Sequence, residues 1–147
     1  MTGLDDVAAL AGQEHGLAVV STLRADATIQ ASVVNAGVLP HQATGRPVAG
    51  FVTYGRVKLA NLRARPQVTL TFRSGWEWIA VEGRAELAGP DDPQPWLTGA
   101  DRLRLLLREV FTAAGGTHDD WDGYDRVMAE QRRTAVLVEP VRVYTNG

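Results

Sequence analysis

The segment YGRVKLANLRARP, residues 54–66, gathers basic side chains and holds the only lysine of this 147-residue chain. Ammonium and guanidinium groups bind phosphates and carboxylates, so a basic cluster is a candidate anion site. Because arginine is abundant in the chain and lysine occurs once, Lys58 is the more informative residue. A solvated, arginine-rich helix face is the alternative interpretation. The basic residues of the segment are Arg56, Lys58, Arg63 and Arg65.

The position of these residues favours the anion site. The apolar run 48–54 predicts a strand, Gly55 a turn, and the spacing of Leu59 and Leu62 a short helix that ends before Pro66. Arg56 and Lys58 then fall at the helix N-terminus, where free N–H groups and the helix dipole already attract an anion. Basic side chains oppose that dipole, and a bound phosphate would resolve the conflict.

Composition limits the partners of such a site. The formal net charge is −2 and the isoelectric point is near 5.9, which argues against a nucleic-acid binder. No cysteine is present, so disulfides and thiolate chemistry are excluded. No apolar run is long enough to cross a membrane, and the first residues do not resemble a secretory leader. We expect a cytoplasmic protein with no membrane partner that binds a small anion.

Short β-branched runs between polar turns predict a mainly β protein with peripheral helices. Amphipathic patterns over 101–116 and 119–133 predict two further helices, joined to the sheet by a surface loop, residues 88–99. Six antiparallel strands with few helices favour a closed or nearly closed barrel in one domain, residues 1–147. The predicted strands span 17–24, 29–39, 48–54, 67–73, 76–87 and 134–144, the last with a bulge or an edge at Pro140.

Other chemistries have weaker support. The three histidines are scattered without metal-ligand spacing, and no dinucleotide, phosphate-loop or serine-nucleophile motif occurs. No metal is therefore expected. His118 is interpreted as a solvated loop residue, with the mouth of a pocket as the alternative. The acidic pairs at 91–92 and 119–120 are interpreted as turn and helix-capping residues.

Several segments resemble, in order, the FMN-binding split-barrel superfamily, the pyridoxamine-phosphate-oxidase-like group. Within it the chain is most similar to the actinobacterial deazaflavin-dependent reductases that use coenzyme F420. GRVKLANLRARP is similar to the family's R-x-K-x-x-N-L-R…P phosphate segment, and GWEWIAVEGRAEL to its W-x-x-x-x-x-G-x-A strand. HGLAVVSTLRADATIQASVV and THDDWDGYDRVM extend the resemblance over nearly the whole chain.

The resemblance implies a six-stranded antiparallel split β-barrel that forms a homodimer, with two cofactor sites at the interface. Arg56 and Lys58 would hold the cofactor phosphate, and Trp78 from a second copy would pack on the cofactor. For Trp78 a plain sheet pair is the alternative, and for Trp76 core or interface packing is expected. The remaining implied contacts are Asn61 on the helix, Val52, Thr53, Tyr54, Gly55 and Val57 around the strand end, and Gln30, Ser32 and Asn35 on the neighbouring strand.

Three functions are compatible with these residues. The first is an F420-dependent reductase that passes a hydride to an enone, quinone or tetrapyrrole. The second is an FMN-dependent oxidoreductase, and the third a non-catalytic F420 or flavin carrier. The arginine-rich composition is typical of GC-rich genomes, such as those of actinobacteria, and favours F420. No catalytic acid or base stands out, and Tyr54 is the best candidate for a proton donor.

Overall fold

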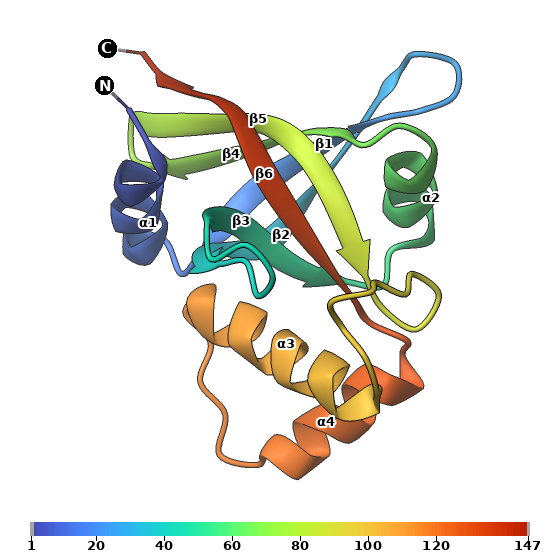
Figure 1. The fold of residues 1–147 in the computed structure, drawn as a ribbon. Helices are drawn as coiled ribbons and strands as arrows, with labels where there is room; N and C mark the ends of the chain where they lie inside the picture. Colours follow the sequence, from blue (N-terminus) through green and yellow to red (C-terminus); the bar gives the residue numbers. More distant parts are fainter. Residues whose placement is uncertain (1, 147) are drawn as a thin grey trace.

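Six antiparallel strands close into a barrel in the computed structural model, which describes residues 2–146 (Figure 1). Around the barrel the strands follow the order β1-β2-β3-β6-β5-β4. The predicted barrel is thus confirmed, and each predicted strand is present with bounds that differ by at most a residue or so. The strands are β1 (Leu17–Leu23), β2 (Ile29–Pro40), β3 (Pro47–Thr53), β4 (Gln67–Ser74), β5 (Glu77–Ala88) and β6 (Thr134–Thr145).

Side chains alternate between the barrel interior and its outer face, as the period of two along a strand requires. Phe51, Leu70 and Phe72 are fully buried in the interior. A second apolar layer lies between the outer face of the sheet and two helices, and includes Leu106, Val110 and Leu137. The barrel therefore has one core inside and one on a covered outer face.

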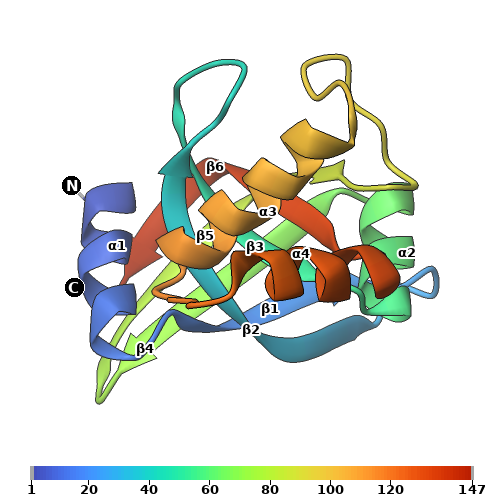
Figure 2. The ribbon, with the colours of Figure 1, turned by 90° about the horizontal axis from the view of Figure 1, so that it is seen from below.

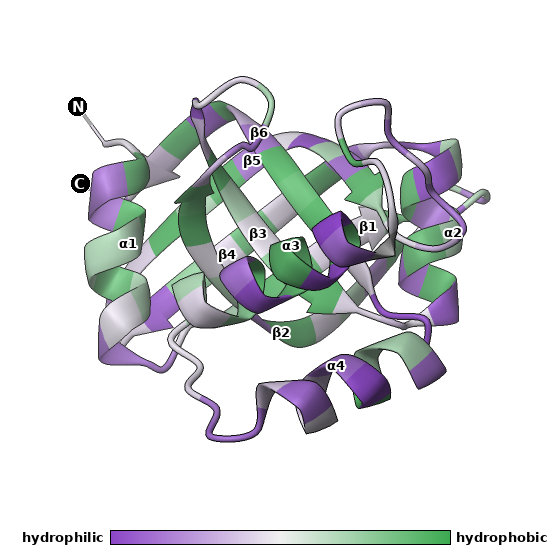
Figure 3. Cartoon of the chain, turned by 60° about the horizontal axis from the view of Figure 1, so that its bottom comes forward, coloured by the Kyte–Doolittle hydropathy of each residue, from purple (hydrophilic) through white to green (hydrophobic). Residues whose placement is uncertain are grey.

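Four helices surround the barrel: α1 (Leu4–Gln13), α2 (Arg56–Ala64), α3 (Ala100–Ala113) and α4 (Trp121–Glu130). α1 and α2 lie at opposite ends of the barrel, and α3 and α4 lie side by side beneath it (Figures 1 and 2). Figure 3 shows both strongly apolar and strongly polar residues along α3, as expected for a helix with one buried face. No helix within residues 2–146 is long and apolar enough to cross a membrane.

Helix α1 was not among the expected elements. Its apolar residues Leu4, Val7, Leu10 and Ala11 have helical spacing, and they pack against the interior core at the barrel end. The other three helices begin within a few residues of their expected positions. Asp120 caps α4 by accepting a hydrogen bond from Gly123 N at 3.0 Å, which confirms its predicted capping role.

A β-bulge interrupts the pairing of β5 with β6. Glu82 pairs with Arg142 and Gly83 with Pro140, so Val141 has no partner and is largely exposed. The sequence predicted a bulge or an edge at Pro140, and the structure has the bulge one residue later. Gly83 is required here because a Cβ would press into the backbone carbonyl of Glu139.

Gly83→Ala should therefore destabilise the barrel by roughly 1–3 kcal/mol, since the obstacle is backbone and cannot rotate away. Chemical denaturation followed by circular dichroism would measure the change. Gly12→Ala is the matched control, because nothing lies within 4 Å of the position of its Cβ. It should leave stability unchanged or raise it by about 0.5–1 kcal/mol. Equal stability of the two variants would contradict this account of the bulge.

Candidate functional site

The end of β3 and the start of α2 bring most of the predicted site residues together. β3 ends at Thr53, and Gly55 is the N-cap of α2 without a side-chain cap. Gly55 N donates to Thr53 Oγ1 at 3.2 Å, which fixes the turn. The first-turn amides of α2 thus receive no side-chain acceptor at the cap, and this is the arrangement that attracts an anion.

Lys58 is the most unusual charged residue of the site. Only 7% of its surface is exposed, its Nζ lies 3.5 Å from Thr53 Oγ1, and it lies 5.9 Å from the centre of the Phe51 ring. Within residues 2–146 it has no carboxylate partner, and burial lowers its pKa. A buried ammonium without a counter-ion is unfavourable unless an anion binds.

Polar residues on the inner face of the barrel continue from Lys58. Asn61 is buried and its Nδ2 donates to Thr22 Oγ1 at 3.0 Å, and Thr22 Oγ1 donates to Gln30 Oε1 at 3.1 Å. Ser32 lies two residues beyond Gln30 on the same face of β2, and its Oγ is buried without a hydrogen-bond partner. Two polar groups at this barrel end, Lys58 Nζ and Ser32 Oγ, are thus poorly satisfied.

Asn35 lies on the opposite face of β2 from Gln30 and Ser32. Its Nδ2 donates to the carbonyl oxygen of His15 at 2.8 Å. It lines a groove of about 760 Å³ together with Val52 of β3, which we name the α3–α4 groove. Its other lining residues are His15, Val110, Phe111, Ala114, Gly115, Gly116, His118, Asp120, Gly123, Tyr124, Arg126, Val127, Met128 and Arg133.

Aromatic side chains form one wall of the α3–α4 groove. The ring centres of Phe111 and Tyr124 are 5.0 Å apart, and those of Trp121 and Tyr124 are 5.3 Å apart. His118 is an exposed loop residue, as expected, and it also lines this groove, with its ring 5.6 Å from that of Tyr124. Burial raises the pKa of Tyr124 to about 12, and its hydroxyl donates to Leu107 O at 3.1 Å.

Tyr54, Arg56 and Val57 stay exposed at the rim of the site. The guanidinium of Arg133 lies 3.9 Å from the centre of the Tyr54 ring, so Arg133 connects the rim to the groove. Sequence reasoning missed Arg133, Arg126 and Phe111. The only local signal for Arg133 was its position directly before the last strand.

Trp78 lies far along the barrel from this site. It is near the start of β5, pairs with Arg73, and packs edge-on against Tyr144 at 6.1 Å. Tyr144 lies near the last residue of β6, whereas Thr53 pairs with Thr134, the first residue of β6, at the opposite end of this strand. One chain alone does not bring Trp78 to the site. Trp76 is 95% exposed, so core packing is wrong for it and only interface packing remains.

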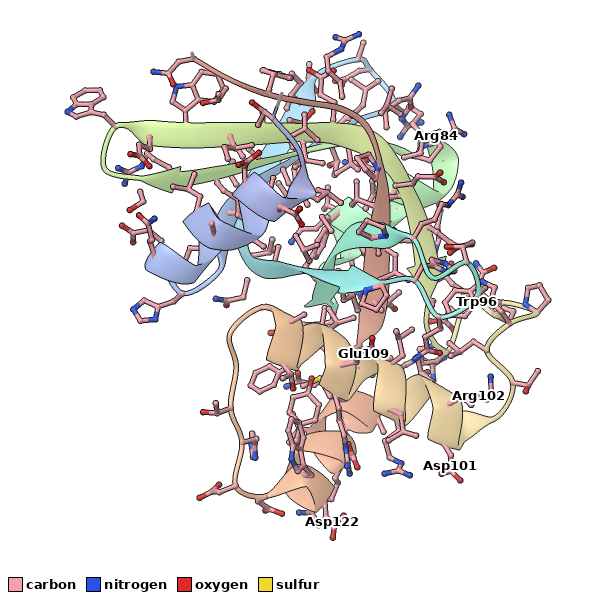
Figure 4. All side chains as sticks on the ribbon, turned by 60° about the vertical axis from the view of Figure 1, so that its left-hand side comes forward. Arg84, Trp96, Asp101, Arg102, Glu109 and Asp122 are labelled. Carbon is pink, nitrogen blue, oxygen red and sulfur yellow. The ribbon has the colours of Figure 1, made fainter. Side chains whose placement is uncertain are left out.

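A larger cavity, of about 1010 Å³, contains none of the predicted site residues. Arg84 and Trp96 line it (Figure 4). Most of its charged groups already have a polar partner: Arg63 pairs with Asp92, and His41 Nε2 lies 2.6 Å from Glu86 Oε1. Asp91 likewise pairs with Arg132, so residues 91–92 form ion pairs in addition to the predicted turn.

Comparison with known proteins identifies the family. A family model described as pyridoxamine 5'-phosphate oxidase matches residues 5–146. The chain therefore belongs to this family, and its barrel is the FMN-binding split barrel that the sequence predicted. A search of curated proteins found no match. Among residues 2–146, no three His, Asp or Glu side chains are placed to hold a metal ion.

Solved structures share the fold at low identity. A conserved hypothetical protein from Mycobacterium tuberculosis is 17% identical, with a TM-score of 0.68 over 99% of this chain and 84% of that one. A protein described as an F420 reductase is 15% identical, with a TM-score of 0.63 over 98% of both chains. An FMN-binding protein from Nostoc punctiforme is 14% identical, with a TM-score of 0.62 over 96% and 82%. These likenesses support the fold.

The burial of Lys58 generates a prediction for the protein without ligand. The pKa of Lys58 in the folded state lies below its ordinary value of 10.5, so its ammonium opposes folding at neutral pH. Lys58→Met should raise the free energy of unfolding at pH 7. This gain should shrink as the pH rises through the lowered pKa of the folded state and should vanish above about 10.5, where the lysine is neutral in both states.

Urea denaturation at pH 7 and pH 10 would measure the effect, with Arg56→Met as control because Arg56 is exposed. A Lys58→Met variant that is less stable than the wild type at pH 7 would mean that the ammonium has a stabilising partner.

Proposed function

We propose that this protein is an F420-dependent oxidoreductase that transfers a hydride from reduced F420 to a small organic acceptor. The observation that carries the proposal is the buried Lys58, which lacks a carboxylate partner at an uncapped helix N-terminus. A cofactor phosphate would supply the missing negative charge. The family and the F420 reductase of the same fold support a flavin-type cofactor. As a user of a reduced cofactor, the enzyme would act in the cytoplasm.

In this proposal Arg56 and Lys58 hold the phosphate, and the first-turn amides of α2 add backbone donors. Ser32 Oγ, which is buried without a partner, is a further donor on the neighbouring strand. Asn61 donates a hydrogen bond to Thr22, and Thr22 donates one to Gln30, so this chain of contacts orients the polar side chains on the inner face of the barrel. Gly55 and Val57 complete the turn around the phosphate.

The ring system would lie along the outer side of the strand end, beside Val52, Tyr54 and Asn35. When bound, reduced F420 supplies the hydride, while the protein orients the acceptor and excludes water. Tyr54 is exposed at the rim, and its hydroxyl is the candidate donor of a proton to the acceptor. Thr53 faces inward, and its Oγ1 contacts Lys58.

A homodimer would complete the site. The outer faces of β1 and β2 expose neighbouring apolar side chains, of which Val33 and Ile29 are about two-thirds exposed, at 64% and 66%. Val33 pairs with Val19, which is exposed on the same face. An apolar strip of this kind is typical of an interface. Trp76 and Trp78, on the β4–β5 hairpin, are then available to a second copy.

FMN is the alternative cofactor, supported by the FMN-binding relative with the same fold. Fluorescence titration of the purified protein with F420 and with FMN would decide between them. F420 should bind more tightly, and the loaded protein should reduce a quinone or an enone. Tighter binding of FMN would overturn the cofactor assignment. Binding of F420 without turnover would mean that the protein is a non-catalytic F420 carrier.

Lys58→Ala should weaken F420 binding about ten- to a hundred-fold, because hydrogen bonds to charged groups contribute roughly 1.5–3 kcal/mol. The same fluorescence titration measures the change. Arg102→Ala is the matched control, since Arg102 is exposed at the start of α3 (Figure 4) and is outside the proposed phosphate site. If Lys58→Ala binds F420 as tightly as the wild type, Lys58 does not bind the cofactor phosphate.

The proposed dimer predicts that the protein sediments as a dimer at low micromolar concentration. Lys58→Ala and Trp78→Ala subunits should each be weak alone and should regain part of the activity when coexpressed. Each mixed dimer would contain one intact site, because the two damaged residues would both fall in the other site. A monomer, or a mixture no more active than its components, would argue against shared sites.

A further inference from the structure

Arg133 differs from the arginines around it. Arg104 and Arg108 both contact Asp125, and Arg132 pairs with Asp91 at 2.5 Å. Arg133 is partly buried, yet within residues 2–146 no carboxylate lies within ion-pair distance of its guanidinium. Its Nε donates to Gln131 Oε1 at 2.8 Å. A partly buried guanidinium that lacks a carboxylate calls for an anionic partner.

The strand register fixes where Arg133 points. Thr53 of β3 pairs with Thr134 of β6, so the residues just beyond this pair, Tyr54 and Arg133, also stand side by side. The guanidinium lies 3.9 Å from the centre of the Tyr54 ring. Stacking on a ring orients the guanidinium plane, and the edge formed by its two Nη groups remains for a bidentate contact, because only Nε is engaged by Gln131. Arg133 also lines the α3–α4 groove, so this edge is available to a ligand there.

The rest of the α3–α4 groove complements an anion attached to a planar group. Arg126 lines the groove and is exposed, with His15 and His118 on the same lining. The carboxylate of Asp120 is engaged in capping α4 and is the only acidic side chain of the lining. Phe111 and Tyr124 add flat apolar surface. The groove is thus positively charged at Arg133 and Arg126 and aromatic along α3 and α4.

We infer that the α3–α4 groove binds an electron acceptor that carries a carboxylate on a planar ring system, and that Arg133 holds the carboxylate. This inference rests on the proposed function, because it names the class of acceptor for the same site. It goes beyond that function by assigning specificity to Arg133. The phosphate site at Lys58 lies on the inner side of the strand end and is separate.

A pair of probes that differ only in charge tests the inference. Isothermal titration calorimetry without cofactor would compare a naphthoquinone that carries a propionate side chain with its methyl ester. The wild type should prefer the carboxylate by about ten-fold or more, and Arg133→Met should reduce this preference about ten- to a hundred-fold. Because the comparison needs no bound F420, it stands even if the proposed F420 chemistry fails.

Arg132→Met is the matched control, since Arg132 is the adjacent arginine and pairs with Asp91 outside the groove. It should keep the wild-type preference. Arg126→Met, which alters a more exposed arginine of the groove, should reduce the preference to a smaller degree and serves if Arg133→Met does not fold. An absence of preference in the wild type, or a preference that survives in Arg133→Met, would overturn the inference.

The carboxylate could instead belong to the cofactor. Titration of Arg133→Met with F420 separates the two sources. Affinity for F420 close to that of the wild type, together with a lost preference between the two quinones, assigns the carboxylate to the acceptor. A parallel loss of F420 affinity would assign it to the cofactor and overturn the inference.

Discussion

The burial of Lys58 on the barrel-facing side of α2 is the constraint on which the site depends. Leu59 and Leu62 must face the barrel for α2 to cover its end, and helical geometry turns Lys58 and Asn61 towards the same side. Asn61 is satisfied by Thr22. Lys58 has only a weak contact with a hydroxyl group, so the packing of the helix itself places an uncompensated charge next to the free amides of the first turn.

The alternation of β3 divides the site between two faces of one strand. Thr53 faces inward and contacts Lys58, while Val52 lines the α3–α4 groove and Tyr54 packs under Arg133. In the proposed function, consecutive residues would therefore serve two different ligand groups, a phosphate on one side and a ring system with its acceptor on the other. Since the strand is short and paired on both sides, the distance between the two groups is fixed by backbone geometry.

Local pattern predicted the strands, the position of α2 and the bulge, because turn residues bound each β-branched run and Pro140 cannot donate in a ladder. The two-residue alternation of a strand also implies that Asn35, an odd number of residues from Gln30, lies on the opposite face of β2. The family resemblance nevertheless places Gln30 and Asn35 in one site. The stacking of Arg133 on Tyr54 depends on the register between β3 and β6. These strands are about eighty residues apart in sequence, and no local signal encodes their register.

The distribution of ion pairs explains how a mildly acidic chain can attract anions at one place. Asp91, Asp92 and Asp125 neutralise arginines on α2, on α3 and beside β6. Lys58 within the barrel and Arg133 in the groove lie on either side of the end of β3, and within residues 2–146 neither has a carboxylate partner. A polyanion needs a continuous basic surface, which this arrangement does not provide. Two separate, partly buried cations suit small ligands, each with its own negative group that can make a direct hydrogen bond to one cation.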